Sequence, residues 1–426
     1  MNYNQLSKKQ LDQALSAARK KYNALLKEKL NLDLSRGKPT SEMLDLSMPM
    51  LDILTGDFTS PKGYDYRNYG IPDGIPELKE VIADVLDVEP GNVMVGGTSS
   101  LNLIYDVVTR AYCFGVCGAT PWCKLPKVRF ICPVPGYDRH FAILEQFGIE
   151  MIAVPMDDNG PDMDMVEDLV ANDQSIKGMF CVPRFSNPSG IVYSDNVVDR
   201  LINMKTLATD FRIFWDNAYC VHSWYPDAPK LKNVFKQNVN LDRFYMFFST
   251  SKITFCSGGI SALIASDKNL QSQRKLLGIQ TINYDKLSQY AHAMFLRNAD
   301  NVKAHMAKHA EFMRPKFDLV LSTLKKRFED NPDVKWTQPK GGYFFTVTTA
   351  PHCARRTIEL CRKAGLKLTD AGCTHPLHQD DMDSSIRLAP SFASLEELEE
   401  GLEVLCCSLE IATLERRCAG EKNSNV

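Results

Sequence analysis

Between residues 128 and 265, short apolar runs alternate with segments long enough to form helices. The runs are rich in Val, Ile and Phe, and they cover residues 128–134, 151–155, 178–182, 213–215, 244–248 and 260–265. Apolar strands that alternate with helices are typical of a mainly parallel sheet buried between two helical layers. The alternation therefore predicts an α/β fold, a three-layer α/β/α arrangement around a mainly parallel sheet.

The pattern changes after residue 285. A helical stretch covers residues 286–328 and is expected to break near Pro315. Beyond it, strand-like pieces at 343–347 and 385–388 lie between helices predicted at 354–364 and 394–414. This change indicates a second, smaller α+β domain. We predict an N-terminal arm helix with the start of the small domain at 1–45, a large domain at 46–310 and a small C-terminal domain at 311–426.

The N-terminal segment 4–30 is predicted to form a helix with one apolar face. Its apolar residues recur every three or four positions among Lys, Gln and Glu, and they are Leu11, Leu15, Ala18, Tyr22 and Leu25. We expect this arm to pack on its own body or on a partner subunit. Another helix is predicted at 76–88, and residues 416–426 are expected to form a frayed tail.

The composition excludes several classes of partner. Lys and Arg number 50 against 52 Asp and Glu, so the formal charge of -2 provides no overall positive field for nucleic acid or an anionic membrane. No stretch approaches the roughly 18 apolar residues that a membrane span needs, and the N-terminus lacks the apolar segment of a secretory signal. We therefore expect a cytoplasmic protein whose partner is a small molecule.

Thirteen cysteines are many for such a protein, and four of them lie close together, at Cys113, Cys117, Cys123 and Cys132. A zinc site favours closer cysteine pairs with neighbouring histidines, and a disulfide framework favours a short secreted chain. We therefore predict no metal site. Most of the thiols are interpreted as reduced and buried, packing like small apolar residues.

Two polar motifs are rich in glycine and hydroxyl groups. Gly96-Gly97-Thr98-Ser99-Ser100 lies between a short apolar segment and a helical pattern, where free backbone N–H groups suit a phosphate. A simple helix cap is the alternative. Ser186-Asn187-Pro188-Ser189-Gly190 follows the apolar run at 178–182, and its composition also fits a plain turn.

Two further motifs bring a carboxylate and an amine to strand ends. In Phe214-Trp215-Asp216-Asn217-Ala218-Tyr219, Asp216 serves as a cap or a ligand, because an unpaired buried carboxylate is costly. In Phe248-Ser249-Thr250-Ser251-Lys252, the flanking segments favour a sheltered, nucleophilic amine over an ordinary surface lysine. Open α/β sheets bind ligands at the carboxyl ends of their parallel strands. Together the four motifs predict one site with a phosphate cradle, an amide, a carboxylate and an amine.

The order of these motifs resembles that of the fold-type I pyridoxal-phosphate-dependent aminotransferases of class I/II. The resemblance rests on NPSG, DxAY and SxSK, followed by Arg387 in SIRLAP, and it extends to DLSRG at 33–37, Tyr69, GGTSS and PKGGYFF at 339–345. It covers most of the chain. The stretches DLSRGKP, YDYRNYGIPDGIPELK and GGTSSLNLIYD are most similar to the MocR-like aspartate aminotransferase subgroup.

The resemblance implies pyridoxal 5′-phosphate as the cofactor and gives it particular partners. Lys252 would form the aldimine with the cofactor aldehyde and then move the proton at the substrate Cα. Asp216 would pair with the pyridinium nitrogen. Asn187 and Tyr219 would hydrogen-bond the phenolic oxygen of the ring. Lys252, Asp216 and Tyr219 are thus the implied catalytic residues.

The motif Pro135-Gly136-Tyr137-Asp138-Arg139-His140 would close the ring site. By the resemblance, Tyr137 would stack on the ring face, and His140 would act on Asp216 from behind it. A core aromatic and a structural histidine are the respective alternatives.

The resemblance also implies a phosphate site formed by Gly97, Thr98, Ser99, Ser249 and Ser251, with Tyr69 reaching it from the neighbouring subunit. In the wider family an arginine after the lysine neutralises the phosphate. Here Gly259, within Cys256-Ser257-Gly258-Gly259, stands at the place assigned to it. Hydroxyls, backbone amides or a basic group such as Arg36, Lys38 or one from the partner chain must then meet the two charges.

Gly37, Asn187 and Arg387 are the implied substrate-binding residues. Arg387 would clamp the α-carboxylate, because its planar fork offers two parallel hydrogen bonds. A structural salt bridge is the alternative for this arginine. For a distal carboxylate the sequence offers Arg36, Lys38 and Arg184.

We therefore predict a homodimer with shared active sites that moves an amino group between an L-amino acid, aspartate above all, and 2-oxoglutarate in a ping-pong cycle. A β-lyase, or an aromatic or kynurenine-type aminotransferase with the same cofactor, is the alternative. A cofactor-binding regulator is more remote, since MocR-type factors carry an N-terminal helix-turn-helix domain and only about 30 residues precede DLSRGKP here.

Overall fold

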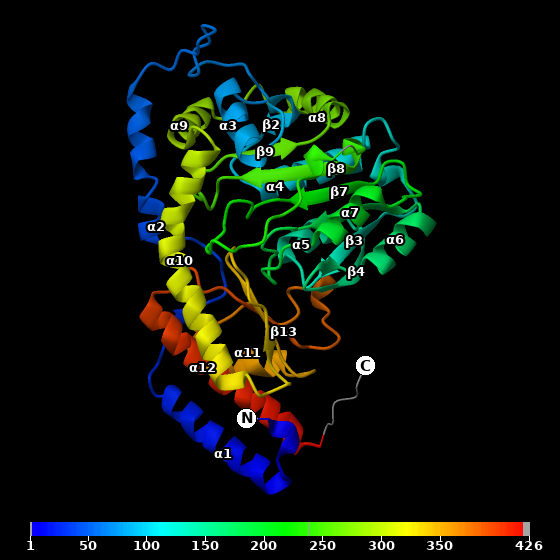
Figure 1. Cartoon of the computed structure of the whole chain (residues 1–426). Helices are drawn as coiled ribbons and strands as arrows, with labels where there is room; N and C mark the ends of the chain where they lie inside the picture. The colour runs from blue at the N-terminus through cyan, green and yellow to red at the C-terminus, as the bar shows by residue number, and fades with distance from the viewer. Residues whose placement is uncertain (1, 238, 421–426) are drawn as a thin grey trace.

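A mixed sheet forms the centre of the larger part of the molecule (Figure 1). The structure is a computed structural model, and it describes residues 2–237 and 239–420. Among these residues the sheet has eight strands in the order β2-β9-β8-β7-β6-β3-β4-β5. The strands are β2 (Val93–Val95), β3 (Arg129–Val134), β4 (Glu150–Asp157), β5 (Gly160–Pro161), β6 (Ile176–Cys181), β7 (Arg212–Asp216), β8 (Phe244–Ser249) and β9 (Ser261–Ile264).

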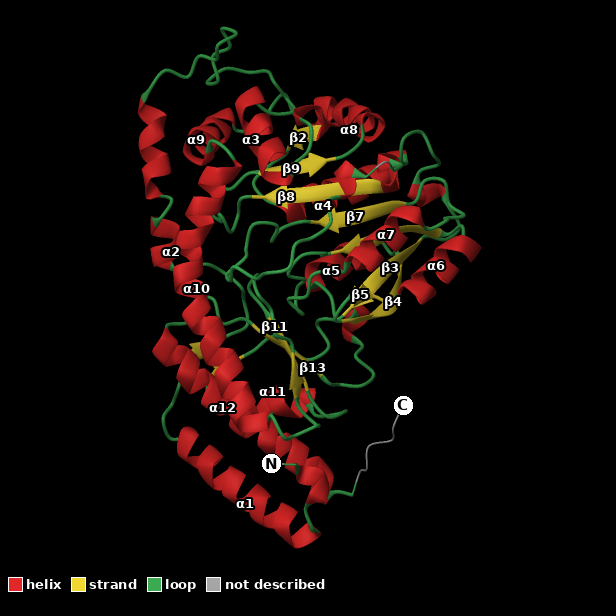
Figure 2. Ribbon diagram, in the orientation of Figure 1, coloured by secondary structure: helices red, strands yellow, loops and turns green. Residues whose placement is uncertain are grey.

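The five strands β8, β7, β6, β3 and β4 are parallel neighbours, and β2, β9 and β5 run antiparallel to their neighbours. All six apolar runs are strands, so the prediction of a mainly parallel α/β sheet is confirmed. Helices surround the sheet (Figure 2), and they are α3 (Pro76–Leu86), α4 (Ser100–Phe114), α5 (Asp138–Gln146), α6 (Met163–Asn172), α7 (Asp195–Asn203), α8 (Asp267–Gln280) and α9 (Lys286–Leu296).

Alternate residues of the central strands belong to two separate apolar clusters. Phe214 and Phe247 pack with side chains of α4, α5 and α8, whereas Ile213 and Met246 pack with side chains of α6 and α7. Successive side chains of a strand point to opposite faces of its sheet. Both faces of the sheet are therefore buried under helices, which gives the predicted three layers.

The helix after β9 does not break where the sequence suggested. The helical stretch divides at Arg297 and Asn298 into α9 and α10 (Ala299–Phe328), and α10 continues through Pro315, so the predicted break at that proline is wrong. The Asn298 side chain accepts a hydrogen bond from the backbone N–H of Asn301 at 2.9 Å and caps the new helix. Buried apolar residues on both sides of Pro315, such as Met313, offset its missing hydrogen bond.

The smaller part carries a three-stranded antiparallel sheet in the order β10-β11-β13 and a parallel pair of β1 and β12. Helix α10 runs from the larger part down to the smaller one (Figure 1). The remaining helices and strands are α1 (Lys8–Leu25), β1 (Leu32–Asp33), α2 (Ser41–Asp45), β10 (Lys335–Trp336), β11 (Phe345–Thr348), α11 (Ala354–Lys363), β12 (Leu366–Lys367), β13 (Ser385–Leu388) and α12 (Leu395–Cys418).

The arm helix α1 packs on its own chain. The hydroxyl of Tyr22 donates to the backbone carbonyl of Leu360 at 2.7 Å, and Arg19 forms an ion pair with Glu415 of α12 at 2.9 Å. Residues 416–418 continue α12, so the predicted tail begins later than expected, and residues 421–426 lie outside the described part of the chain.

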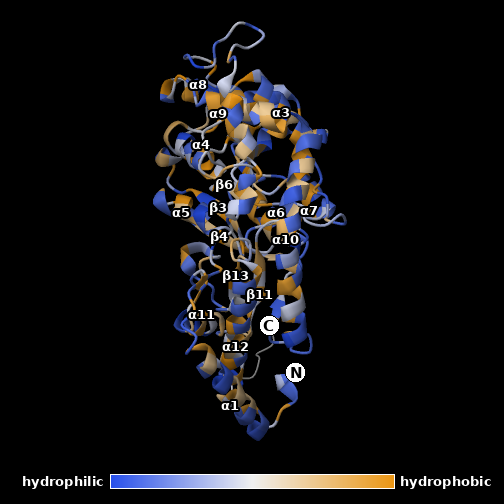
Figure 3. Cartoon of the chain, turned by 90° about the vertical axis from the view of Figure 1, so that its left-hand side faces the viewer, coloured by the Kyte–Doolittle hydropathy of each residue, from blue (hydrophilic) through white to orange (hydrophobic). Residues whose placement is uncertain are grey.

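No described helix combines the length and the apolar character that crossing a membrane requires. Figure 3 shows hydrophilic and hydrophobic residues mixed along the helices. Eight of the thirteen cysteines are buried and all thirteen are free thiols, which confirms the interpretation that most of them pack in the interior. Cys113 and Cys123 of the four clustered cysteines are exposed instead.

Candidate active site

The predicted amide, carboxylate and amine follow three adjacent strands. Asn187 lies in the loop after β6, Asp216 is the last residue of β7, and Lys252 lies in the turn after β8. Because these strands are parallel neighbours, their carboxyl ends meet at one edge of the sheet. A cleft of about 740 Å³ opens there, and the predicted site residues that line it are Gly37, Tyr137, Asn187, Tyr219, Lys252 and Arg387.

Asp216 is a buried carboxylate with one free oxygen. Nε2 of His140 donates to Oδ2 of Asp216 at 3.1 Å, and the His140 ring is stacked on Phe180 with ring centroids 4.3 Å apart. The contact predicted between His140 and Asp216 is thus present. Oδ1 of Asp216 is buried and receives no hydrogen bond from any described residue. A buried carboxylate oxygen requires a donor, and the protonated ring nitrogen of pyridoxal 5′-phosphate is a donor that fits this atom.

Lys252 has its amine in the cleft and its backbone held by histidines. Nζ lies 5.0 Å from the centroid of the Tyr219 ring. Nε2 of His222 donates to the carbonyl oxygen of Lys252 at 3.3 Å, and Nε2 of His305 lies 2.8 Å from the carbonyl oxygen of Ile253. Burial lowers the pKa of His222 to about 3, so this donor remains neutral. The turn that carries the amine is therefore fixed by neutral, buried donors.

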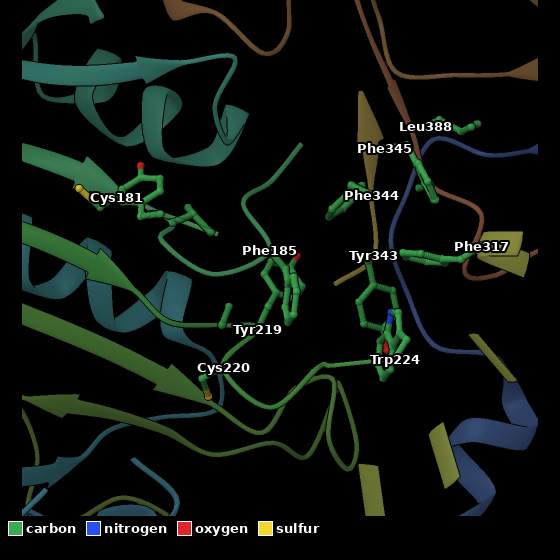
Figure 4. Close-up of a cluster of buried hydrophobic side chains, with 14 of the residues drawn as sticks. Cys181, Phe185, Tyr219, Cys220, Trp224, Phe317, Tyr343, Phe344, Phe345 and Leu388 are labelled. Carbon is green, nitrogen blue, oxygen red and sulfur yellow. The ribbon is translucent and has the colours of Figure 1, made fainter. Parts of the chain in front are cut away.

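Aromatic side chains from the two parts of the molecule form a buried cluster (Figure 4), and Tyr219 and Phe344 of this cluster line the cleft. The ring of Tyr219, which follows β7, lies 6.1 Å from that of Tyr343 and 6.3 Å from that of Phe344. A Cβ on Gly37 would lie 2.6 Å from Cζ of Phe344 and 2.9 Å from Cβ of Tyr343. Only glycine fits beside these rings, which is why the chain passes so close to the cleft at this position.

Tyr137 lies on the other side of the cleft, directly before α5. Its ring meets that of His140 edge-on, with the centroids 4.9 Å apart. Burial raises the pKa of Tyr137 to about 12, so the phenol keeps its proton at neutral pH. Its stacking on a cofactor ring remains a prediction.

The residues predicted to bind a phosphate lie near the start of α4 and the ends of β8 and β9. The backbone N–H and hydroxyl of Ser261 both donate to the carbonyl of Gly97, at 2.8 and 3.0 Å, and Ser261 pairs with Ser249 across β8 and β9. The hydroxyl of Ser251 lies 3.4 Å from the carbonyl oxygen of Thr98. Ser99 caps α4 by accepting from the backbone N–H of Asn102. These residues lie close together, but none of them is among the residues that line the cleft, and their binding of a phosphate stays a prediction.

The segment that lacks the expected arginine has no room for one. A Cβ on Gly259 would lie 3.0 Å from the carbonyl oxygen of Phe255 and 3.1 Å from that of Thr98. The eighth residue after Lys252 is Ile260 rather than Gly259, and its apolar side chain is buried as well. Neither position therefore carries a cationic side chain.

Tyr69 lies outside the cleft of its own chain, and 79% of its surface is exposed. Its predicted contact with the phosphate of a neighbouring subunit stays a prediction.

Arg387 is only 8% exposed and makes contacts on every side of its guanidinium. Nη1 donates to Oδ1 of Asp138 at 2.9 Å and lies 3.4 Å from Oδ1 of Asn187. Nε and Nη2 lie 3.3 and 3.1 Å from Oγ1 of Thr369. The sequence-based reasoning missed Asp138 and Thr369, although Asp138 directly follows Tyr137 in a motif that it singled out. Arg387 forms the salt bridge named as the alternative and also lines the cleft, and its binding of a substrate carboxylate stays a prediction.

Three further arginines line the cleft, Arg36, Arg139 and Arg362. Arg362 forms an ion pair with Asp370 at 2.5 Å. No described residue forms an ion pair or hydrogen bond with the side chain of Arg36 or of Arg139. The structure places the other predicted cations elsewhere: Nζ of Lys38 lies 3.6 Å above the Phe392 ring, and Arg184 donates to the carbonyl of Cys220. The sequence-based reasoning named Arg36 and missed Arg139.

Comparisons with known proteins agree with this geometry. The model of the family described as "Aspartate amino-transferase" matches residues 6–421. A protein named aspartate aminotransferase from Corynebacterium glutamicum is 43% identical over 402 residues, which cover 93% of each chain.

Two solved structures resemble the whole chain. An aspartate transaminase from Corynebacterium glutamicum superposes with a TM-score of 0.93 at 40% identity, covering 98% of this chain and 99% of that one. A putative aminotransferase from Corynebacterium diphtheriae superposes with a TM-score of 0.91 at 43% identity, covering 94% of this chain and 100% of that one. The likeness thus extends over both parts of the molecule.

Proposed function

The chain belongs to the aspartate amino-transferase family, and we propose that it moves an amino group between L-aspartate and 2-oxoglutarate in a ping-pong cycle with pyridoxal 5′-phosphate as cofactor. The observation that supports this most strongly is the buried, unsatisfied Oδ1 of Asp216 beside the strand end that carries Lys252. When bound, pyridoxal 5′-phosphate supplies an electron-accepting ring that stabilises negative charge at the substrate Cα. The similarity to the MocR-like subgroup stays a prediction.

Asp216 and His140 together hold the ring nitrogen end of the site. Oδ1 of Asp216 would accept a hydrogen bond from the protonated ring nitrogen, while His140 contacts Oδ2 and restrains the carboxylate. Because this carboxylate is buried, its charge acts in a poorly screening environment and keeps the proton on the ring.

Lys252 would hold the cofactor aldehyde through Nζ, and the same amine would serve to move the proton at the substrate Cα. Asn187 and Tyr219 face the same cleft, and we assign them as hydrogen-bond donors to the phenolic oxygen of the ring. Burial raises the pKa of Tyr219, so its hydroxyl stays protonated and able to donate. Tyr137, directly before α5, would cover the ring and exclude water from it.

Hydroxyls and backbone amides bind the phosphate in this proposal. Gly97, Thr98 and Ser99 supply the N-terminus of α4, and Ser249 and Ser251 supply hydroxyls from the end of β8 and the following turn. The exposed Tyr69 completes the cradle from the neighbouring subunit of a homodimer. The homodimer and the cytoplasmic location both remain predictions.

Cations in the cleft favour a substrate with two carboxylates. Arg387 binds the α-carboxylate beside Asn187, and Gly37 leaves room for the substrate backbone. Arg36 and Arg139 line the same cleft without a partner among the described residues, so they are available for the distal carboxylate. Guanidinium groups bind carboxylates with paired hydrogen bonds, which supports aspartate and 2-oxoglutarate as the substrate pair.

The test combines spectroscopy with a substrate panel. The purified protein with cofactor is expected to show an absorbance band of the lysine-bound cofactor that aspartate abolishes and 2-oxoglutarate restores. Lys252→Ala is expected to abolish transamination, and normal turnover by this variant would show that the mechanism is wrong. Pyruvate and ammonia released from a cysteine conjugate without any 2-oxo acid would identify a β-lyase instead.

A further inference from the structure

The arginine that should receive the substrate already holds a carboxylate of the protein. Oδ1 of Asp138, at the first residue of α5, accepts from Nη1 of Arg387 at 2.9 Å. Both residues line the cleft that contains Lys252. The α-carboxylate of a substrate and the carboxylate of Asp138 therefore compete for one guanidinium.

We propose that Asp138 is an affinity-setting residue, a resident carboxylate that occupies Arg387 between turnovers and is displaced by the α-carboxylate of the incoming substrate. This inference rests on the proposed function, because it takes Arg387 as the α-carboxylate site. It assigns a role to a residue that neither the motif pattern nor the family membership assigns.

The geometry permits this exchange. The contact uses one oxygen of Asp138 and one nitrogen of Arg387, so it is not the bidentate pair that binds such groups most tightly. The side chain of Asp138 is 28% exposed, against 8% for that of Arg387. Asp138 can turn toward the water of the cleft, where its charge is solvated, while the arginine stays buried.

Arg387 keeps its position when Asp138 leaves. Oγ1 of Thr369 lies within 3.3 Å of both Nε and Nη2, and the Thr369 hydroxyl itself donates to the carbonyl of Ser35. These contacts hold the plane of the guanidinium independently of Asp138. Nη1, beside Asn187, is the nitrogen that becomes free for the substrate.

The exchange makes carboxylate binding weaker than at an empty arginine, and it does so for every ligand. A ligand with a second carboxylate recovers affinity at Arg36 and Arg139, which carry no resident carboxylate among the described residues. A ligand with one carboxylate does not. Asp138 thus lowers the affinity of Arg387 for all carboxylates. Dicarboxylates still bind well because they also contact Arg36 and Arg139, whereas small monocarboxylates dissociate readily.

The experiment measures the affinity of the holoenzyme for unreactive acids after the charge of Asp138 is removed. Asp138→Asn keeps an acceptor oxygen for Arg387, and Asp138→Ser removes the charge with a smaller group. Titration calorimetry with maleate and with propionate is expected to give dissociation constants about tenfold lower in both variants than in the unmodified enzyme. The KM for 2-oxoglutarate is expected to fall similarly, without any rise in kcat.

Asp370→Asn is the matched control. Asp370 lines the same cleft, but its partner is Arg362, at 2.5 Å, and both side chains are mostly exposed. Removing this charge is expected to change the maleate dissociation constant less than about twofold.

Unchanged or weaker maleate binding in both Asp138 variants would overturn the proposal, because a merely structural Asp138 would leave Arg387 less well placed. The result is independent of aspartate turnover. If the unmodified enzyme fails to transaminate aspartate, the proposed substrate is wrong, while the calorimetric comparison still decides the role of Asp138.

Discussion

Replacement of Gly259 by alanine is expected to weaken cofactor binding although it removes no polar group. A Cβ at this position would lie 3.0 Å from the carbonyl oxygen of Phe255, 3.1 Å from that of Thr98 and 3.3 Å from Cα of Ser251. All three are backbone atoms, so none of them can move aside by a side-chain rotation. Thr98 and Ser251 belong to the proposed phosphate cradle, and the added methyl group would push them apart.

The size of the effect follows from two opposing contributions. Overpacking against a fixed backbone costs about 1–3 kcal/mol. Neither Gly258 nor Gly259 has a positive φ, so alanine adopts either conformation without strain and stabilises the fold by about 0.4–1 kcal/mol through the unfolded chain. The net loss of folding stability at Gly259 is therefore about 0–2.6 kcal/mol. Cofactor affinity does not involve the unfolded chain, and it is expected to fall about fivefold or more if the cradle takes up at least about 1 kcal/mol of the strain.

Gly258→Ala provides the control, because the nearest heavy atom to its Cβ would be Cβ of Phe255, at 3.9 Å. The dissociation constant of pyridoxal 5′-phosphate is measured by titrating the cofactor-free chain and following absorbance, together with the thermal unfolding of both variants. Gly258→Ala is expected to bind as the unmodified chain does. Equal affinities for the two variants would refute the argument that Gly259 is fixed by the backbone of the cradle.

Three further predictions concern the site and its surroundings. Asp216→Asn removes the buried charge and is expected to lower the rate of a single half-reaction with aspartate by about a hundredfold or more, with cofactor content checked by absorbance; an unchanged rate would contradict the role of this carboxylate. Arg36→Ala combined with Arg139→Ala is expected to raise the KM for aspartate at least about tenfold and to leave that for alanine unchanged, and an equal rise for both amino acids would show that the two arginines do not bind a distal carboxylate. Burial lowers the pKa of His222 to about 3, so below pH 6.5 the unfolded chain takes up a proton that the folded chain does not. The contribution of this neutral histidine is present above pH 6.5 and is lost toward pH 3, by about 1.4 kcal/mol per pH unit. Urea unfolding at pH 7.0 and 5.5 should show a smaller pH effect for His222→Gln than for the unmodified chain, and equal effects would contradict the argument.

The fold of the larger part of the molecule was predictable because it depends on local patterns of apolar and polar residues. Each apolar run lies between helical segments, and a strand that is buried on both faces is apolar throughout. The direction of a strand is not encoded in this way, which is why the antiparallel pairing of β9 with β8 and β2 did not follow from the run at 260–265. The boundary between α9 and α10 was missed because Pro315 is the stronger breaker by composition, whereas the capping by Asn298 decides the boundary.

The amide, carboxylate and amine of the site were predictable for a related reason. Asn187, Asp216 and Lys252 follow successive parallel strands, and the topology of such a sheet brings their ends together whatever the loops contain. No knowledge of how the two parts of the molecule meet is needed for these three residues.

The partners of Arg387 could not be predicted in this way, because they depend on how the larger and smaller parts of the molecule pack together. Asp138 lies on α5 in the larger part and Arg387 on β13 in the smaller part, 249 positions away along the chain. Which acid reaches the arginine is decided by the way the two parts pack, through contacts such as the hydrogen bond from the backbone N–H of Gly136 to the carbonyl of Thr374 at 2.7 Å. Sequence spacing ranks none of the 52 acidic residues above the others for this position. A residue that competes with the substrate is therefore visible only in the assembled cleft, where its distance and exposure can be compared with those of the arginine that it occupies.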